Sequence, residues 1–90
     1  MTTATIMNEF LKFAVEGYSK ATQNRQYVAG KVESLLKHAE DDPYLANNKE
    51  FMQVARKLNE RLTMEELSNI CMQLPRLQTE YSKWLANQKM

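Results

Sequence analysis

The segment from Thr5 to Glu40 contains no proline, and its apolar side chains recur at alternating steps of four and three residues. Such a seven-residue repeat is typical of a long helix that packs against other helices. The positions in phase are Met7, Leu11, Ala14, Tyr18, Ala21, Val28, Val32, Leu35 and Ala39. Arg25 occupies the same seam, and the polar run over 22–26 is where we expect a kink if the helix bends. The pattern therefore predicts one long N-terminal helix over about 5–40.

The rest of the chain adds three shorter helices. An antiparallel helix is expected over about 48–62, and a helical pair over about 64–74 and 76–87, with Pro75 either kinking or breaking it. Asp42 before Pro43 has the form of an N-cap followed by proline at the first helical position. Thr63 and Glu66 have the spacing of a capping box. The sequence thus predicts an all-α fold, a small bundle of three to four helices.

Length and composition favour one helical domain over 1–90. The chain has 43% hydrophobic and 26% charged residues, only two Gly and two Pro, and a net charge of +1. Its single Cys excludes an internal disulfide, and no apolar run approaches the roughly twenty residues that span a bilayer. Because the N-terminus also lacks a secretion signal, we expect a cytoplasmic protein with no membrane association.

Apolar side chains are densest between Ile6 and Val15, where they cover well over half of the helix circumference. We expect the remaining residues to be too few to cover all of this surface. The sequence therefore predicts a homo-oligomer that also binds another protein, as an adaptor, chaperone or inhibitor. The expected interaction residues are Ile6, Met7, Phe10, Leu11 and Phe13.

Catalytic chemistry has little support in the sequence. The single His, His38, and the single Cys, Cys71, are far apart and form no metal-ligand spacing. His38 is expected to interact with a helix C-terminus, and Cys71 to pack as a small hydrophobe. Two isolated glycines cannot form a phosphate-binding loop. We expect neither enzyme activity nor a cofactor nor a bound metal.

Two alternative functions rest on basic residues. Tyr18, Arg25, Tyr27 and Lys31 could bind a small anionic ligand, such as a nucleotide, at a subunit interface. The bland interpretation of Arg25 is that it extends its charge to the edge of the seam or marks a local kink, and a third interpretation is that it sets the register between copies. Arg56, Lys57 and Arg61 could contact nucleic acid weakly through one helix face, although near-neutral net charge makes this partner unfavourable.

Overall fold

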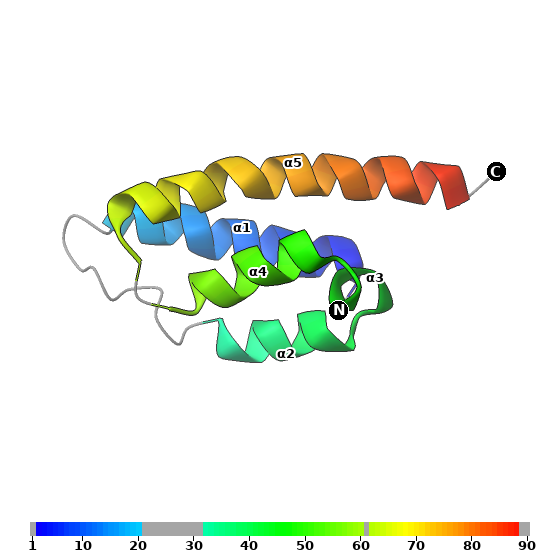
Figure 1. The fold of residues 1–90 in the computed structure, drawn as a ribbon, viewed down its shortest axis with the longest axis horizontal. Helices are drawn as coiled ribbons and strands as arrows, with labels where there is room; N and C mark the ends of the chain where they lie inside the picture. Colours follow the sequence, from blue (N-terminus) through cyan, green and yellow to red (C-terminus); the bar gives the residue numbers. More distant parts are fainter. Residues whose placement is uncertain (1, 21–31, 61, 89–90) are drawn as a thin grey trace.

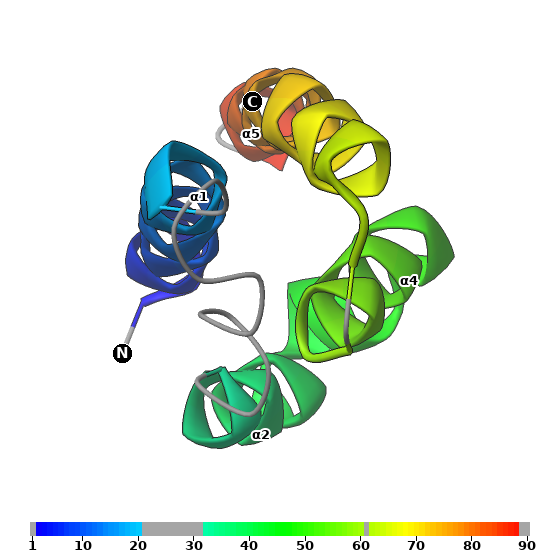
Figure 2. The same cartoon turned by 90° about the vertical axis from the view of Figure 1, so that its left-hand side faces the viewer.

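The protein is an all-α bundle, described by a computed structural model over residues 2–20, 32–60 and 62–88. Its helices are α1 (Thr3–Lys20), α2 (Glu33–Asp41), α3 (Pro43–Ala46), α4 (Lys49–Leu58) and α5 (Met64–Gln88), and the described residues include no strand. Figure 2 shows α1, α2, α4 and α5 around one core, with α5 between α1 and α4. Consecutive long helices run in opposite directions, and the short α3 joins α2 to α4 (Figure 1). This up-and-down arrangement confirms the predicted all-α class.

The prediction of one long N-terminal helix is wrong. Helix α1 ends at Lys20, and α2 begins at Glu33 and runs back beside it, so the longest helix is the C-terminal α5 (Figure 1). The apolar repeat keeps its phase because both helices face the same core. Such a repeat reports which side of each helix is apolar and does not show that the helices are continuous. The expected kink at 22–26 lies outside the described residues.

Polar side chains start three of the helices, two of them at the predicted positions. Asp42 caps α3 by accepting hydrogen bonds from the Tyr44 and Leu45 amides. Thr63 and Glu66 form the capping box of α5, in which each side chain accepts the other residue's backbone N–H, at 3.1 and 3.0 Å. The Thr63 amide is the first cause that lowers the pKa of Glu66, followed by Lys57. The third cap, Asn48, starts α4 by accepting from the Phe51 amide.

Helix α5 passes through Pro75 without a break, which replaces the predicted pair over 64–74 and 76–87 with one helix. Proline has no N–H to donate to the carbonyl one turn earlier, so the helix loses one internal bond at that point. The Pro75 ring is exposed, and its carbonyl accepts a hydrogen bond from the Thr79 hydroxyl at 3.1 Å. The apolar stripe on the opposite side continues from Leu74 to Leu77, and its burial holds the two halves together.

The core joins all five helices. Phe10 of α1 and Phe51 of α4 meet edge to face at its centre, with ring centroids 5.4 Å apart. The buried hydrophobic side chains are Ile6, Met7, Phe10, Ala14, Val32, Leu35, Ala39, Leu45, Phe51, Met52, Val54, Ala55, Leu58, Leu67, Ile70, Leu74 and Leu77. Among the described residues, no helix is both long and apolar enough to cross a membrane.

Candidate functional site

At one end of the bundle, α5 extends beyond its neighbours, and three aromatic side chains gather where it passes α3 (Figure 1). Tyr44 of α3 packs against Tyr81 and Trp84 of α5, with centroid distances of 4.8 and 4.7 Å. Tyr81 and Trp84 are close to parallel, at 5.9 Å and 24°. We call Tyr44, Tyr81 and Trp84 the aromatic ledge. Trp84 is 42% exposed, so the ledge offers a large ring to a ligand.

The sequence around Asp42 holds Tyr44 in place. One oxygen of the Asp42 carboxylate accepts the Tyr44 and Leu45 amides, each at 3.0 Å. The other oxygen accepts the Thr3 hydroxyl at 2.5 Å, which ties the start of α1 to the start of α3. Leu45 is fully buried and anchors the short helix from its inner side. A helix of one turn could not hold a tyrosine by itself, and these contacts supply the missing constraint.

An open hollow of about 590 Å³ lies beside the ledge. Its lining residues come from α3, from the α3–α4 connection, from the start of α4 and from α5: Pro43, Tyr44, Asn47, Asn48, Lys49 and Trp84. The two asparagines place amide groups at the rim, although the Asn47 amide nitrogen already donates to the Pro43 carbonyl at 2.7 Å. Lys49 is the only charged residue of the lining. The hollow therefore combines aromatic walls with amides and one positive charge.

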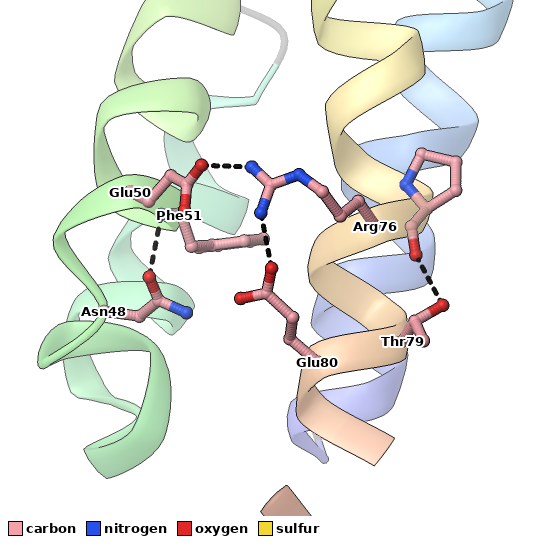
Figure 3. Close-up of polar contacts among 7 residues, drawn as sticks. Asn48, Glu50, Phe51, Arg76, Thr79 and Glu80 are labelled. Atoms are coloured by element: carbon pink, nitrogen blue, oxygen red, sulfur yellow. Dashed lines mark hydrogen bonds and ion pairs between the residues drawn. The ribbon is translucent and has the colours of Figure 1, made fainter. Parts of the chain in front are cut away.

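An ion-pair network links α5 to α4 next to the ledge (Figure 3). The Arg76 guanidinium donates to Glu50 of α4 and to Glu80 of its own helix. Glu50 follows Lys49 of the hollow, and Glu80 precedes Tyr81 of the ledge. The bond to Glu50 is the main cause that raises the pKa of Arg76 above its ordinary value. All three side chains are about half exposed, so solvent weakens these pairs, and the network only adds to the core packing that positions α5.

The direction of the Tyr44 pKa shift does not favour a role for this residue as a base. Burial raises the pKa of Tyr44 above its ordinary value of 10.0, and the charge of Glu80 adds to this, while a hydrogen bond with Asn48 acts against it. The phenol is therefore protonated at neutral pH and can donate a hydrogen bond without acting as a base. Elsewhere, burial raises the pKa of the Cys71 thiol, which lowers its thiolate population. In the described part of the chain, no three His, Cys, Asp or Glu side chains cluster to hold a metal ion.

The five residues predicted to bind a partner lie in or against the core. Ile6, Met7 and Phe10 are at most 2% exposed, and Leu11 and Phe13 are half-buried beside them. The fold covers most of this segment, because α1 lies between α5 and α2 and faces α4 across the core (Figure 2), although Val15 stays 51% exposed. The surplus of apolar surface that suggested an interaction site is thus largely used within the chain itself.

The structure does not assemble either alternative site among its described residues. Tyr18 lies exposed on α1, and its proposed companions Arg25, Tyr27 and Lys31 lie outside the described residues. The anionic-ligand site stays a prediction.

The basic face of α4 is only partly described. Arg56 and Lys57 are exposed, Arg61 lies outside the described residues, and the Lys57 ammonium pairs with Glu66 of α5 at 3.3 Å. That pair lowers the positive charge available to phosphates, and nucleic-acid binding also stays a prediction.

The aromatic ledge was not predicted, because its residues are distant in the sequence. Tyr81 and Trp84 fall within the helix predicted over 76–87, and Tyr44 follows Pro43. One signal was available: Tyr81 and Trp84 are three residues apart near the end of a helix, beyond Leu77, and residues at this spacing lie on the same face. The partner Tyr44 could be identified only after the fold brought α3 beside α5. Comparison of the chain with protein-family models, with curated proteins and with solved structures found no match in any of the three.

Proposed function

We propose that this protein is a non-catalytic binding protein that takes up an extended, proline-containing segment of a partner protein at the aromatic ledge. The observation that carries the proposal is the exposed Trp84 ring, supported from behind by Tyr44 and Tyr81 at the edge of the 590 Å³ hollow. Large aromatic rings held rigid by their neighbours are the groups that contribute most to binding at protein interfaces.

Proline-containing segments suit this surface for two reasons. Their rings pack flat against tryptophan and tyrosine, and their extended conformation leaves backbone carbonyls free to accept hydrogen bonds. The indole N–H of Trp84 makes no hydrogen bond among the described residues, and the amide of Asn48 lies at the rim. Because Lys49 is the only charge in the lining, an acidic residue next to the proline would complete the match.

A direct test uses the fact that Trp84 is the only tryptophan of the chain. Titration with a synthetic peptide of consecutive prolines flanked by glutamates should shift the Trp84 emission to shorter wavelength and saturate. Because the hollow is open, we expect weak binding, with a dissociation constant on the order of 100 µM. The matched control is the same peptide with glycine in place of every proline, which should leave the emission unchanged.

Variants then locate the site. With a dye-labelled peptide, Trp84→Ala should abolish the change in anisotropy, and Lys49→Glu should weaken binding to the acidic peptide. Lys37→Glu, the same charge reversal at an exposed position of α2 that does not line the hollow, is the matched control and should have no effect. A proline peptide that leaves the emission of Trp84 unchanged at millimolar concentration would contradict the proposal.

A further inference from the structure

A groove of about 240 Å³ follows the contact between α4 and α5. It shares no lining residue with the hollow beside the aromatic ledge. Its floor is apolar, because the buried side chains of Val54 and Ile70 belong to its lining. Pockets for drug-sized ligands start at about 300 Å³, so this groove fits a smaller molecule. We call it the interhelical groove.

The sides of the interhelical groove carry carboxamide groups. Gln53 contributes one from α4, and Asn69 and Gln73, one turn apart on α5, contribute two more. All three side chains are exposed, and none of them makes a hydrogen bond in the described part of the chain. A carboxamide has an oxygen that accepts and an NH₂ group that donates. Both sides of the groove therefore offer donors and acceptors to a ligand.

One end of the groove holds an ion pair that links the two helices. The Lys57 ammonium lies 3.3 Å from one oxygen of the Glu66 carboxylate. The other oxygen accepts the Thr63 amide in the capping box, which holds the carboxylate at the start of α5. This bond is also the first cause that lowers the pKa of Glu66, so the group is charged at neutral pH. The ammonium has three N–H donors, and its contact with Glu66 leaves donors for a ligand.

The charges of the lining cancel, and this restricts the class of ligand. Lys57 and Glu66 are the only charged residues among those that line the groove. An anion such as phosphate would lie beside Glu66 with no second cation to offset the repulsion, and a cation would lie beside Lys57. A zwitterion brings one charge of each sign and can place each beside the opposite group. Charge complementarity therefore favours a zwitterionic ligand.

We propose that the interhelical groove binds a free α-amino acid with a carboxamide side chain, of the glutamine type. The α-carboxylate of this ligand accepts from Lys57, and its α-ammonium donates to Glu66. Its side-chain amide pairs with that of Gln73, and its methylene groups lie on Val54 and Ile70. An apolar side chain in the same place would cover carboxamides without giving them partners, which costs free energy.

Titration of the isotope-labelled full chain with glutamine, followed by NMR, tests the proposal. The side-chain amide resonances of Gln53, Asn69 and Gln73 should shift together and saturate. Because the groove is open and the ligand is small, we expect a dissociation constant on the order of 1 mM. Two matched ligands are leucine, of similar size without the amide, and glutaminol, which lacks the α-carboxylate. Each should bind about fivefold more weakly than glutamine.

Variants then assign the roles of the side chains. Lys57→Met removes the charge and keeps the length of the side chain, so it should weaken glutamine binding about fivefold. Lys49→Met makes the same change at an exposed position of α4 that does not line the groove, and this matched control should leave binding unchanged. Gln73→Leu should lower the affinity for glutamine to that for leucine. Circular dichroism verifies that each variant is folded.

Three results would each overturn the proposal: no shift of the three amide resonances at about 50 mM glutamine, far above the expected constant, equal affinities for glutamine and glutaminol, or unchanged binding by folded Lys57→Met. If Lys57→Met does not fold, the comparison of glutamine with glutaminol decides alone. Trp84→Ala should keep glutamine binding and lose peptide binding, so the two proposals can fail separately.

Discussion

The first turns of α1 and the last turns of α5 lie at the same end of the bundle, and both carry large apolar side chains (Figure 1). In α1, Ile6, Met7 and Phe10 are almost completely buried. In α5, Trp84 and Leu85 are exposed. Two segments with similar chemistry thus have opposite environments.

The difference comes from how far the neighbouring helices extend. Phe10 meets Phe51 in the first turn of α4, so a facing helix covers it. Beyond Leu77, Gln78 still donates a hydrogen bond to Asn8 of α1, and Tyr44 of the short α3 packs against Tyr81 and Trp84, which leaves Trp84 partly exposed. Local apolar density therefore does not decide whether a segment is buried, because burial depends on the reach of the elements opposite.

Phe10→Ala should have the largest effect on stability. Removing a fully buried phenylalanine costs about 3–5 kcal/mol, a large fraction of the stability of a chain this size. Urea denaturation followed by circular dichroism measures the loss. Phe13→Ala, at a half-buried position of the same helix, is the matched control and should lose clearly less. Equal losses for the two variants would remove the contrast between a covered and a partly covered face of α1.

The fold was predictable wherever the signal is local. The cap at Asp42 and the box formed by Thr63 and Glu66 are complete within four residues, and both were located correctly. The connection between α1 and α2 was missed, because an apolar repeat in constant phase describes one helix and two antiparallel helices equally well. At Pro75 the sequence left a kink or a break open, and burial of the stripe on either side gives one helix.

The candidate site was less predictable than the fold. The density of apolar residues pointed to Ile6 and Phe10 as interaction residues. Both lie in the core, because α4 packs opposite them and the sequence pattern does not show this. The aromatic ledge requires Tyr44 to lie beside Trp84. These residues are forty positions apart in the sequence, so their contact could not be predicted from it.

Asp42→Ala should have the next largest effect, and it extends the comparison to the element that covers the end of α5. The variant removes the acceptor of two amides and of the Thr3 hydroxyl, so we expect a loss of about 1–2 kcal/mol. With α3 loosened, Trp84 should become more exposed and its emission should shift to longer wavelength.

Two controls accompany this variant. Asp42→Asn keeps an oxygen that can cap the helix and should retain most of the stability. Asp41→Ala, at the exposed neighbouring position, should change stability by less than about 0.5 kcal/mol. Unchanged Trp84 emission in Asp42→Ala would mean that α3 does not depend on its cap to cover α5.

Trp84→Ala tests how much the exposed end of α5 contributes to stability. The indole contributes contacts with Tyr44 and Tyr81, which are worth about 1 kcal/mol together at a partly exposed position. Urea denaturation should therefore show a small loss next to that of Phe10→Ala, while binding of the proline peptide disappears. A loss as large as that of Phe10→Ala would identify Trp84 as part of the core and remove it as a candidate for binding.

The smallest effect concerns Tyr44, which lies at the boundary between the covered and the exposed region. Burial raises its pKa in the folded protein above the ordinary value of 10.0, which we take for the unfolded chain. The protonated phenol therefore contributes its full stabilisation below pH 10.0, and this contribution is lost as pH rises toward the folded-state pKa, because the unfolded chain releases its proton first. Tyr44→Phe should make the decrease of the urea midpoint above pH 10.0 shallower than in the wild type, with little change at neutral pH. If the two decreases coincide, Tyr44 ionises as readily in the folded chain as in the unfolded one, and α3 covers the end of α5 less than its ring contacts imply.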